Sequence, residues 1–210
     1  MATFSASDYA GKYTGAKPSR IAGTLRVLGV DPAVVGATGY GVIEYDGPVP
    51  TLLRFGALKL PARATFASRL REIHRVIAQL VEEFAPDAVA VESVFTALNM
   101  RTALKLAEVR GVVLLAAAQA SIPSHSYSPR EVKASVAGYG GASKQQMQQM
   151  VSSLLRLSSV PEPADAADAL AVALCHAHLS QARERLAASI RVRATAVPHS
   201  NRSRAARVPN

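Results

Sequence analysis

The 210-residue sequence has one cysteine, no leader-like segment and no long apolar run. The single thiol, Cys175, excludes an internal disulfide and fits a reducing compartment, so we expect a cytoplasmic protein. Residues 1–23 lack the apolar core of a secretory signal. The most apolar helical stretch, residues 112–120, is too short to cross a bilayer, so we expect no membrane association.

Acidic residues are also scarce, with 15 Asp and Glu against 24 Lys and Arg, for a net charge of +9. Residues 191–210 hold five arginines and no acid, and residues 1–23 contribute a further +2, which leaves +2 for residues 24–190. Basic tails are typical of polyanion binding, nucleic acid above all, although a solvated extension without a function would have the same composition. Of the acids between the tails, Glu44 and Asp46 are assigned to solvent.

Apolar periodicity predicts an α/β domain over residues 24–188, flanked by a disordered N-terminal extension (1–23) and a basic disordered tail (189–210). Strands are expected near 25–30, 40–45, 52–60, 88–91 and 122–127. Helices are expected to begin near Thr65, Asn99, Ser128 and Ser143 and within 161–170, and the last should end near Ala188. Three strands in hairpin linkage followed by strand–helix crossovers predict a mixed five-stranded sheet with helices on both faces.

Four acidic residues border apolar elements in three separate segments. Asp31 follows the run 25–30, and Glu92 ends the run 88–91. Asp165 and Asp168 lie three apart among alanines, so a helix would place them on one face that can pack closely on a sheet.

No cysteine or histidine cluster with zinc-binding spacing accompanies these acids, since His176 and His178 are two apart and would diverge on a helix. Carboxylates alone select hard cations such as Mg²⁺ or Mn²⁺. Two such ions could activate water and stabilise the leaving oxygen of a phosphodiester, which makes the four acids candidate metal-binding and catalytic residues.

Each acid also has a purely structural interpretation. Asp165 could be the N-cap of the last helix, with Asp168 at the N3 position. Glu92 could pair with an arginine, and Asp31 could be a turn residue. Spacing alone leaves both interpretations open.

Six stretches, in order along residues 25–180, resemble the RuvC-type Holliday-junction resolvases. They are GVDP (29–32), TGYGV (38–42), VESVF (91–95), ALKLAEVRG (103–111), VKASVAGYGGASKQQ (132–146) and ADAADALAVAL (164–174). The resemblance implies a ribonuclease H-like fold and a homodimer that binds four-way junction DNA in homologous recombination and DNA repair. It further implies an endodeoxyribonuclease that makes paired symmetric nicks with 5′-phosphate and 3′-hydroxyl ends. Two Mg²⁺ per active site are implied, with Mn²⁺ as a substitute, together with a RuvA–RuvB branch-migration partner.

The resemblance also assigns roles to individual residues. Its metal-binding catalytic acids correspond to Asp31, Glu92, Asp165 and Asp168. Lys133 and Lys144 match DNA-binding lysines near the scissile backbone, and Phe95 matches an aromatic that stacks on a base near the junction centre. Without the resemblance, Phe95 would be assigned to the core and both lysines to the solvated surface. The apolar helix after Arg101 would supply much of the dimer contact.

The turn after Asp31 departs from the family pattern in two ways. Ala33 stands where the family usually has glycine, and the turn between Asp31 and Gly39 is one residue longer. If position 33 required a positive φ, alanine there would cost about 1–2 kcal/mol.

Two other functions stay open on the sequence. The GVDP…TGYG hairpin resembles the first phosphate loop of actin-like ATPases and sugar kinases, although a chain of this length cannot hold the second, duplicated domain of those phosphotransferases. ATP turnover would identify such an enzyme. A non-catalytic protein that binds junction or duplex DNA on the same fold is the other alternative, and comparing DNA binding with strand cleavage would separate it from a nuclease.

Overall fold

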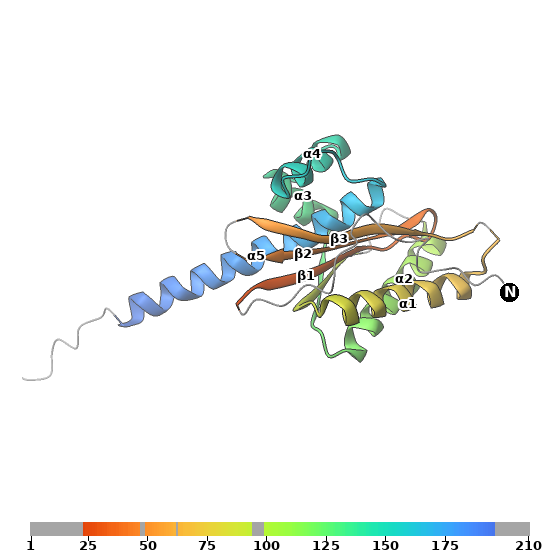
Figure 1. The fold of residues 1–210 in the computed structure, drawn as a ribbon, viewed down its shortest axis with the longest axis horizontal. Helices are drawn as coiled ribbons and strands as arrows, with labels where there is room; N and C mark the ends of the chain where they lie inside the picture. The colour runs from red at the N-terminus through yellow and green to blue at the C-terminus, as the bar shows by residue number, and fades with distance from the viewer. Residues whose placement is uncertain (1–22, 47–48, 62, 94–98, 196–210) are drawn as a thin grey trace, which may run out of the picture. The chain divides into compact units, whose positions relative to one another are not determined.

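A computed structural model describes residues 23–46, 49–61, 63–93 and 99–195, which form a five-stranded sheet and five helices (Figure 1). The strands are β1 (Leu25–Asp31), β2 (Ala37–Tyr45), β3 (Pro50–Lys59), β4 (Ala88–Glu92) and β5 (Ser124–Tyr127). The helices are α1 (Phe66–Phe84), α2 (Met100–Gln119), α3 (Pro129–Ala137), α4 (Lys144–Leu154) and α5 (Ala164–Thr195). Residues up to His178 form one compact unit, and the chain from Leu179 onward forms a second.

The strand order in the sheet is β3-β2-β1-β4-β5. β1, β2 and β3 pair antiparallel, whereas β4 pairs parallel with both β1 and β5. Figure 1 shows α1 and α2 on one side of this sheet and the α3–α4 pair on the other. The predicted mixed five-stranded sheet with helices on both faces is therefore confirmed.

Local capping chemistry sets the helix starts. The side chains of Thr65 and Asn99 accept hydrogen bonds from the first turns of α1 and α2. Ser128 and Ser143 each form a complete capping box, in which the N-cap side chain and the third helical residue bond to one another's backbone N–H groups. These four boundaries agree with the sequence prediction. The end of α5 does not, because the helix continues to Thr195 rather than ending near Ala188.

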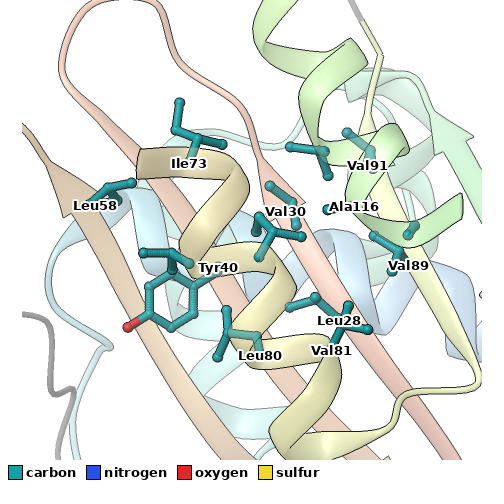
Figure 2. Close-up of a cluster of buried hydrophobic side chains, with 14 of the residues drawn as sticks. Leu28, Val30, Tyr40, Leu58, Ile73, Leu80, Val81, Val89, Val91 and Ala116 are labelled. Carbon is teal, nitrogen blue, oxygen red and sulfur yellow. The ribbon is translucent and has the colours of Figure 1, made fainter. Parts of the chain in front are cut away.

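Strand alternation divides the core between the two faces of the sheet. Leu28 and Val30 of β1, like Val89 and Val91 of β4, belong to the apolar cluster beneath α1 and α2. Figure 2 shows these side chains with Tyr40 between the sheet and α1. The alternate residues of β1, Gly29 and the terminal Asp31, therefore face the opposite side of the sheet.

On that opposite side α5 lies directly on β1 and β2. A Cβ atom added to Gly39 would come within 1.9 Å of the backbone oxygen of Asp165, and one added to Gly29 within 2.2 Å of that of Ala169. Only glycine permits such an approach of helix backbone to strand backbone. Small residues on both partners thus fix the height of α5 above the sheet.

The assignment of Glu44 to solvent is wrong. Glu44 is buried, and its Oε2 accepts a hydrogen bond of 2.9 Å from Nε of Arg26, which is buried beside it. The Arg26 guanidinium also donates to the backbone oxygen of Phe84 at the end of α1. The periodic pattern hides this pair, because a charged side chain inside a strand is buried only when a partner meets it from the neighbouring strand. Asp46 is exposed, as expected.

The long turn after β1 contains no strained alanine. Its positive φ of 93° falls on Gly36, whereas Ala33 has no positive φ and its backbone N–H donates to Thr38 Oγ1 at 3.3 Å. The left-handed position in this turn is thus a glycine, and the cost considered for Ala33 does not arise.

None of the helices in the described part of the chain is both long enough and apolar enough to cross a membrane.

Candidate active site

The first two candidate acids are brought together by the register of two parallel strands. Gly29 pairs with Ala90 and Val30 with Val91, so Asp31 and Glu92 follow next at the same edge of the sheet. Alternation places both on the face covered by α5. Because each acid is the last residue of its strand, its backbone is fixed by the ladder while its side chain reaches past the core.

The second pair of acids comes from the first two turns of α5. Asp165 is the second residue of the helix, and its backbone oxygen lies over Gly39, the β2 residue that pairs with Asp31. Asp168 lies one turn further on. Neither residue caps the helix, since α5 begins at Ala164, so the capping interpretation is wrong. The contact with Gly39 instead sets the distance between α5 and the end of β1.

A cavity of about 260 Å³ opens where these elements meet. Its charged lining consists of Asp31, Glu92, Asp168, Lys133 and Lys144, and α3, α4 and α5 complete the wall. Asp165 is not part of the lining, although its charge acts on Asp31. Three of the four acids and both lysines named from the sequence thus share one cavity. Phe95 lies outside the described residues.

Burial in the cavity raises the pKa values of Asp31 and Glu92. Burial raises the pKa of Asp31 to about 8, with further contributions from the negative charges of Glu92, Asp168 and Asp165, while Lys144 opposes the shift. Burial and then Asp168 raise the pKa of Glu92, while Lys133 lowers it. With all three lining acids ionised, the cavity would hold more negative charge than its two lysines balance, and the raised pKa values oppose that ionisation.

Lys144 is the cation nearest to this charge. Its Nζ donates to Asp168 Oδ2 at 2.9 Å, and this hydrogen bond raises the lysine's pKa. Lys144 is the first residue of α4, immediately after the capping serine, so the capping box that starts the helix also fixes the point from which the lysine extends. Lys133 enters the same cavity from α3.

The donor set fits a hard divalent cation, although the side chains are not closed around one point. Among the described residues, no three Asp, Glu, His or Cys side chains stand close enough to enclose a single ion. Asp168 is engaged by Lys144 instead. All the acids nevertheless offer oxygen ligands, which such cations prefer, and their burial and mutual repulsion would be relieved by a bound positive charge.

The two histidines on α5 have partners elsewhere. Nδ1 of His176 lies 2.7 Å from the hydroxyl of Tyr127, and Nδ1 of His178 lies 3.2 Å from the backbone oxygen of Ser135. Neither histidine lines the cavity. Sequence reasoning did not identify Val132 and Met147, two of the apolar residues that line the cavity, because nothing in their pattern separates them from ordinary core residues.

Comparison with known proteins places this geometry in a family. The family model described as crossover junction endodeoxyribonuclease RuvC matches residues 27–176. A protein of that name from Chloroflexus aggregans is 47% identical over 165 residues, which cover 79% of this chain and all of the relative. The structure of Thermus thermophilus RuvC is similar, with a TM-score of 0.69 and 34% identity over 75% of this chain and 96% of that one. A structure of T. thermophilus RuvC in complex with a Holliday junction substrate has a TM-score of 0.68 and 32% identity, again over 75% and 96% of the two chains.

Proposed function

This chain belongs to the RuvC family of crossover junction endodeoxyribonucleases, and from that membership we propose that it is a Holliday-junction resolvase. It cuts four-way DNA junctions that arise in homologous recombination and DNA repair, by paired nicks that leave 5′-phosphate ends. The observation that carries this function is the cavity in which Asp31, Glu92 and Asp168 meet Lys133 and Lys144. Acids and lysines in one cavity suit a phosphodiester, which needs both a metal site and positive charge for the phosphate.

Asp31, Glu92 and Asp168, with Asp165 beside them, would hold the metal. Two Mg²⁺ ions are expected, and Mn²⁺ in their place; when bound, they supply an activated water and stabilise the leaving oxygen. Lys144 and Lys133 contact the phosphate near the cut. Lys144, whose Nζ donates to Asp168 Oδ2, would reach the phosphate from the same side of the cavity. A bound cation would lower the raised pKa of Asp31, because it stabilises the ionised carboxylate.

The outer face of α2 supports a homodimer. Small and apolar side chains are exposed along it at helical spacing, a stripe formed by Met100, Leu104, Ala107, Gly111, Leu115 and Ala118. Met100 is 74% exposed and Leu104 is 59% exposed. A second copy of the chain would bury this stripe and place two active sites on one junction, as two symmetric nicks require.

The remaining assignments depend on family membership alone. Phe95 is proposed to stack on a base near the junction centre. The RuvA–RuvB branch-migration complex is the proposed partner, and the cytoplasm, where a reducing environment suits the single Cys175, is the proposed location.

A synthetic four-way junction tests the function directly. With Mg²⁺ the protein should nick it at symmetric positions and leave a linear duplex of the same sequence uncut. Asp31→Asn keeps the shape of the side chain but removes a charge and a ligand, so it should abolish nicking while junction binding survives. Mg²⁺ should raise the melting temperature of the parent protein more than that of the variant, because the ion binds the native cluster. Parental nicking by Asp31→Asn, or equal cutting of linear duplex, would falsify the proposal.

A further inference from the structure

Tyr139 is an exposed aromatic side chain in the turn between α3 and α4. Half of its surface is exposed (50%), and no other aromatic residue in the described part of the chain is as open. The turn has the sequence GYGG, so glycines at 138, 140 and 141 leave the ring without covering neighbours in the chain. A ligand that covers the ring would gain free energy, because it removes apolar surface from water.

A hydrogen bond holds the hydroxyl end of the ring. Its hydroxyl donates to Gln146 Oε1 at 2.8 Å, and the same oxygen accepts the backbone N–H of Ser143, also at 2.8 Å. The ring also lies near Gly141, since a Cβ added to that glycine would stand 3.7 Å from the ring carbons Cδ2 and Cε2. Tyr139 is thus fixed to the capping box of α4 and supported by the backbone of its own turn. Such a side chain loses little conformational entropy when it binds a ligand.

The surroundings of Tyr139 are positively charged. The Arg130 side chain passes beside Gly140, with Cγ 2.7 Å from the position of an added Cβ. Lys133 and Lys144, on the helices before and after the turn, line the acidic cavity. The single acid between residues 129 and 146 is Glu131, whose carboxylate is engaged by Ser128 in a capping box.

We propose that Tyr139 is a stacking platform for a nucleotide of the DNA strand that enters the cavity. Aromatic rings interleaved with cations are the usual surface for unstacked nucleotides, because the ring meets the base while the cations meet the phosphates. The Tyr139 hydroxyl bonds to Gln146 in the capping box of α4, the helix that begins at Lys144. One turn would therefore position both the nucleotide stacked on the ring and the phosphate beside the acids. The inference rests on the proposed resolvase function, since it needs a strand in the cavity.

The chain contains no tryptophan, so Tyr139→Trp introduces a single fluorescent reporter at this position. In an Asp31→Asn background, which prevents cutting, a four-way junction should quench the reporter's emission, because a base stacked on indole quenches it. Val160→Trp is the matched control: Val160 is exposed in the loop beyond the other end of α4, and its reporter should keep its emission. Unchanged emission of the Tyr139→Trp protein at saturating junction would overturn the proposal.

A second comparison tests whether junction binding needs the aromatic ring of Tyr139 or only an apolar side chain of similar size. With otherwise native protein at one salt concentration, Tyr139→Leu should weaken junction binding by about fivefold or more, whereas Tyr139→Phe, which keeps the ring, should lose less. Equal losses in the two variants would overturn the stacking role, since they would trace the effect to the hydroxyl bond with Gln146. Failure of the parent protein to cut a junction would instead contradict the resolvase function, so the two failures are distinguishable.

Discussion

At the scale of single residues, Asp31 affects the folding stability of the protein as well as its proposed catalytic activity. Its carboxyl pKa is raised to about 8 by burial and then by the neighbouring acids. A carboxyl with a raised native pKa binds its proton more tightly in the folded than in the unfolded protein. Between the ordinary value near 4 and pH 8, ionisation therefore favours the unfolded state.

This imbalance predicts how the metal-free protein responds to pH. Its free energy of unfolding should fall as pH rises from about 5 to 8, with a contribution from Asp31 of up to about 1.4 kcal/mol per pH unit. Asp31→Asn removes the titrating group, so the slope should flatten. Denaturant unfolding in the presence of a chelator measures both curves. If the two proteins show parallel curves, Asp31 does not carry the shifted proton.

Lys144 offers a second prediction at this scale. Lys144→Ala should slow junction nicking by about 10²-fold and change junction affinity far less, because the ammonium is expected beside the phosphate where charge develops. Lys59→Ala removes an exposed lysine that is not part of the cavity lining, and so controls for loss of charge. Single-turnover rates and binding curves should be measured on the same junction. Equal losses of rate and affinity would reduce Lys144 to a binding contact.

At the scale of the elements, α2 presents both a buried face and an exposed stripe. We expect Leu104→Glu to shift the protein from dimer to monomer, because it places a charge in the proposed interface. Leu186→Glu is a matched control: Leu186 is similarly exposed but lies on the second unit, and this change should leave the dimer intact. Sedimentation or light scattering of the two variants decides the matter. A Leu104→Glu protein that stays dimeric would exclude α2 as the interface.

The elements also show what could be predicted from the sequence. Ser128 and Ser143 were identified as N-caps because the residues of a capping box lie within four consecutive positions of the sequence. Asp31 and Glu92 were placed at strand ends because apolar runs stop there. The buried pair of Arg26 and Glu44 was missed although their two strands were expected to form a hairpin, because its burial depends on the register of that hairpin and on the end of α1 that covers it.

The roles of Lys133 and Lys144 could not be predicted from the residues next to them in the sequence either. Both lysines reach the cavity from helices that pack on it only in the folded chain, so the resemblance alone singled them out. Gly39 shows the same limit. Nothing around it in the sequence shows that α5, more than a hundred residues later, comes to lie against it.

At the scale of the whole molecule, the distribution of charge predicts how the tails act. Removing residues 191–210 deletes five arginines, so it should weaken binding to every DNA alike and reduce the salt dependence of binding. Removing residues 1–20, with a net charge of +2, should have a smaller effect. Affinity for junction and duplex should be measured over a series of salt concentrations. An unchanged slope after removal of the arginines would show that the tail does not contact phosphate.

The contact between α5 and the two central strands has a consequence for temperature. Gly29, Gly39 and Ala169, which meet there, have no side-chain torsions that could populate different rotamers as the protein warms. The spacing between Asp31 and the acids of α5 is therefore set by backbone atoms in direct contact rather than by an average over side-chain conformers. We expect the backbone positions from which the acids extend to stay constant up to the temperature at which the whole unit unfolds, so that the nicking rate rises smoothly and then drops with the melting transition itself.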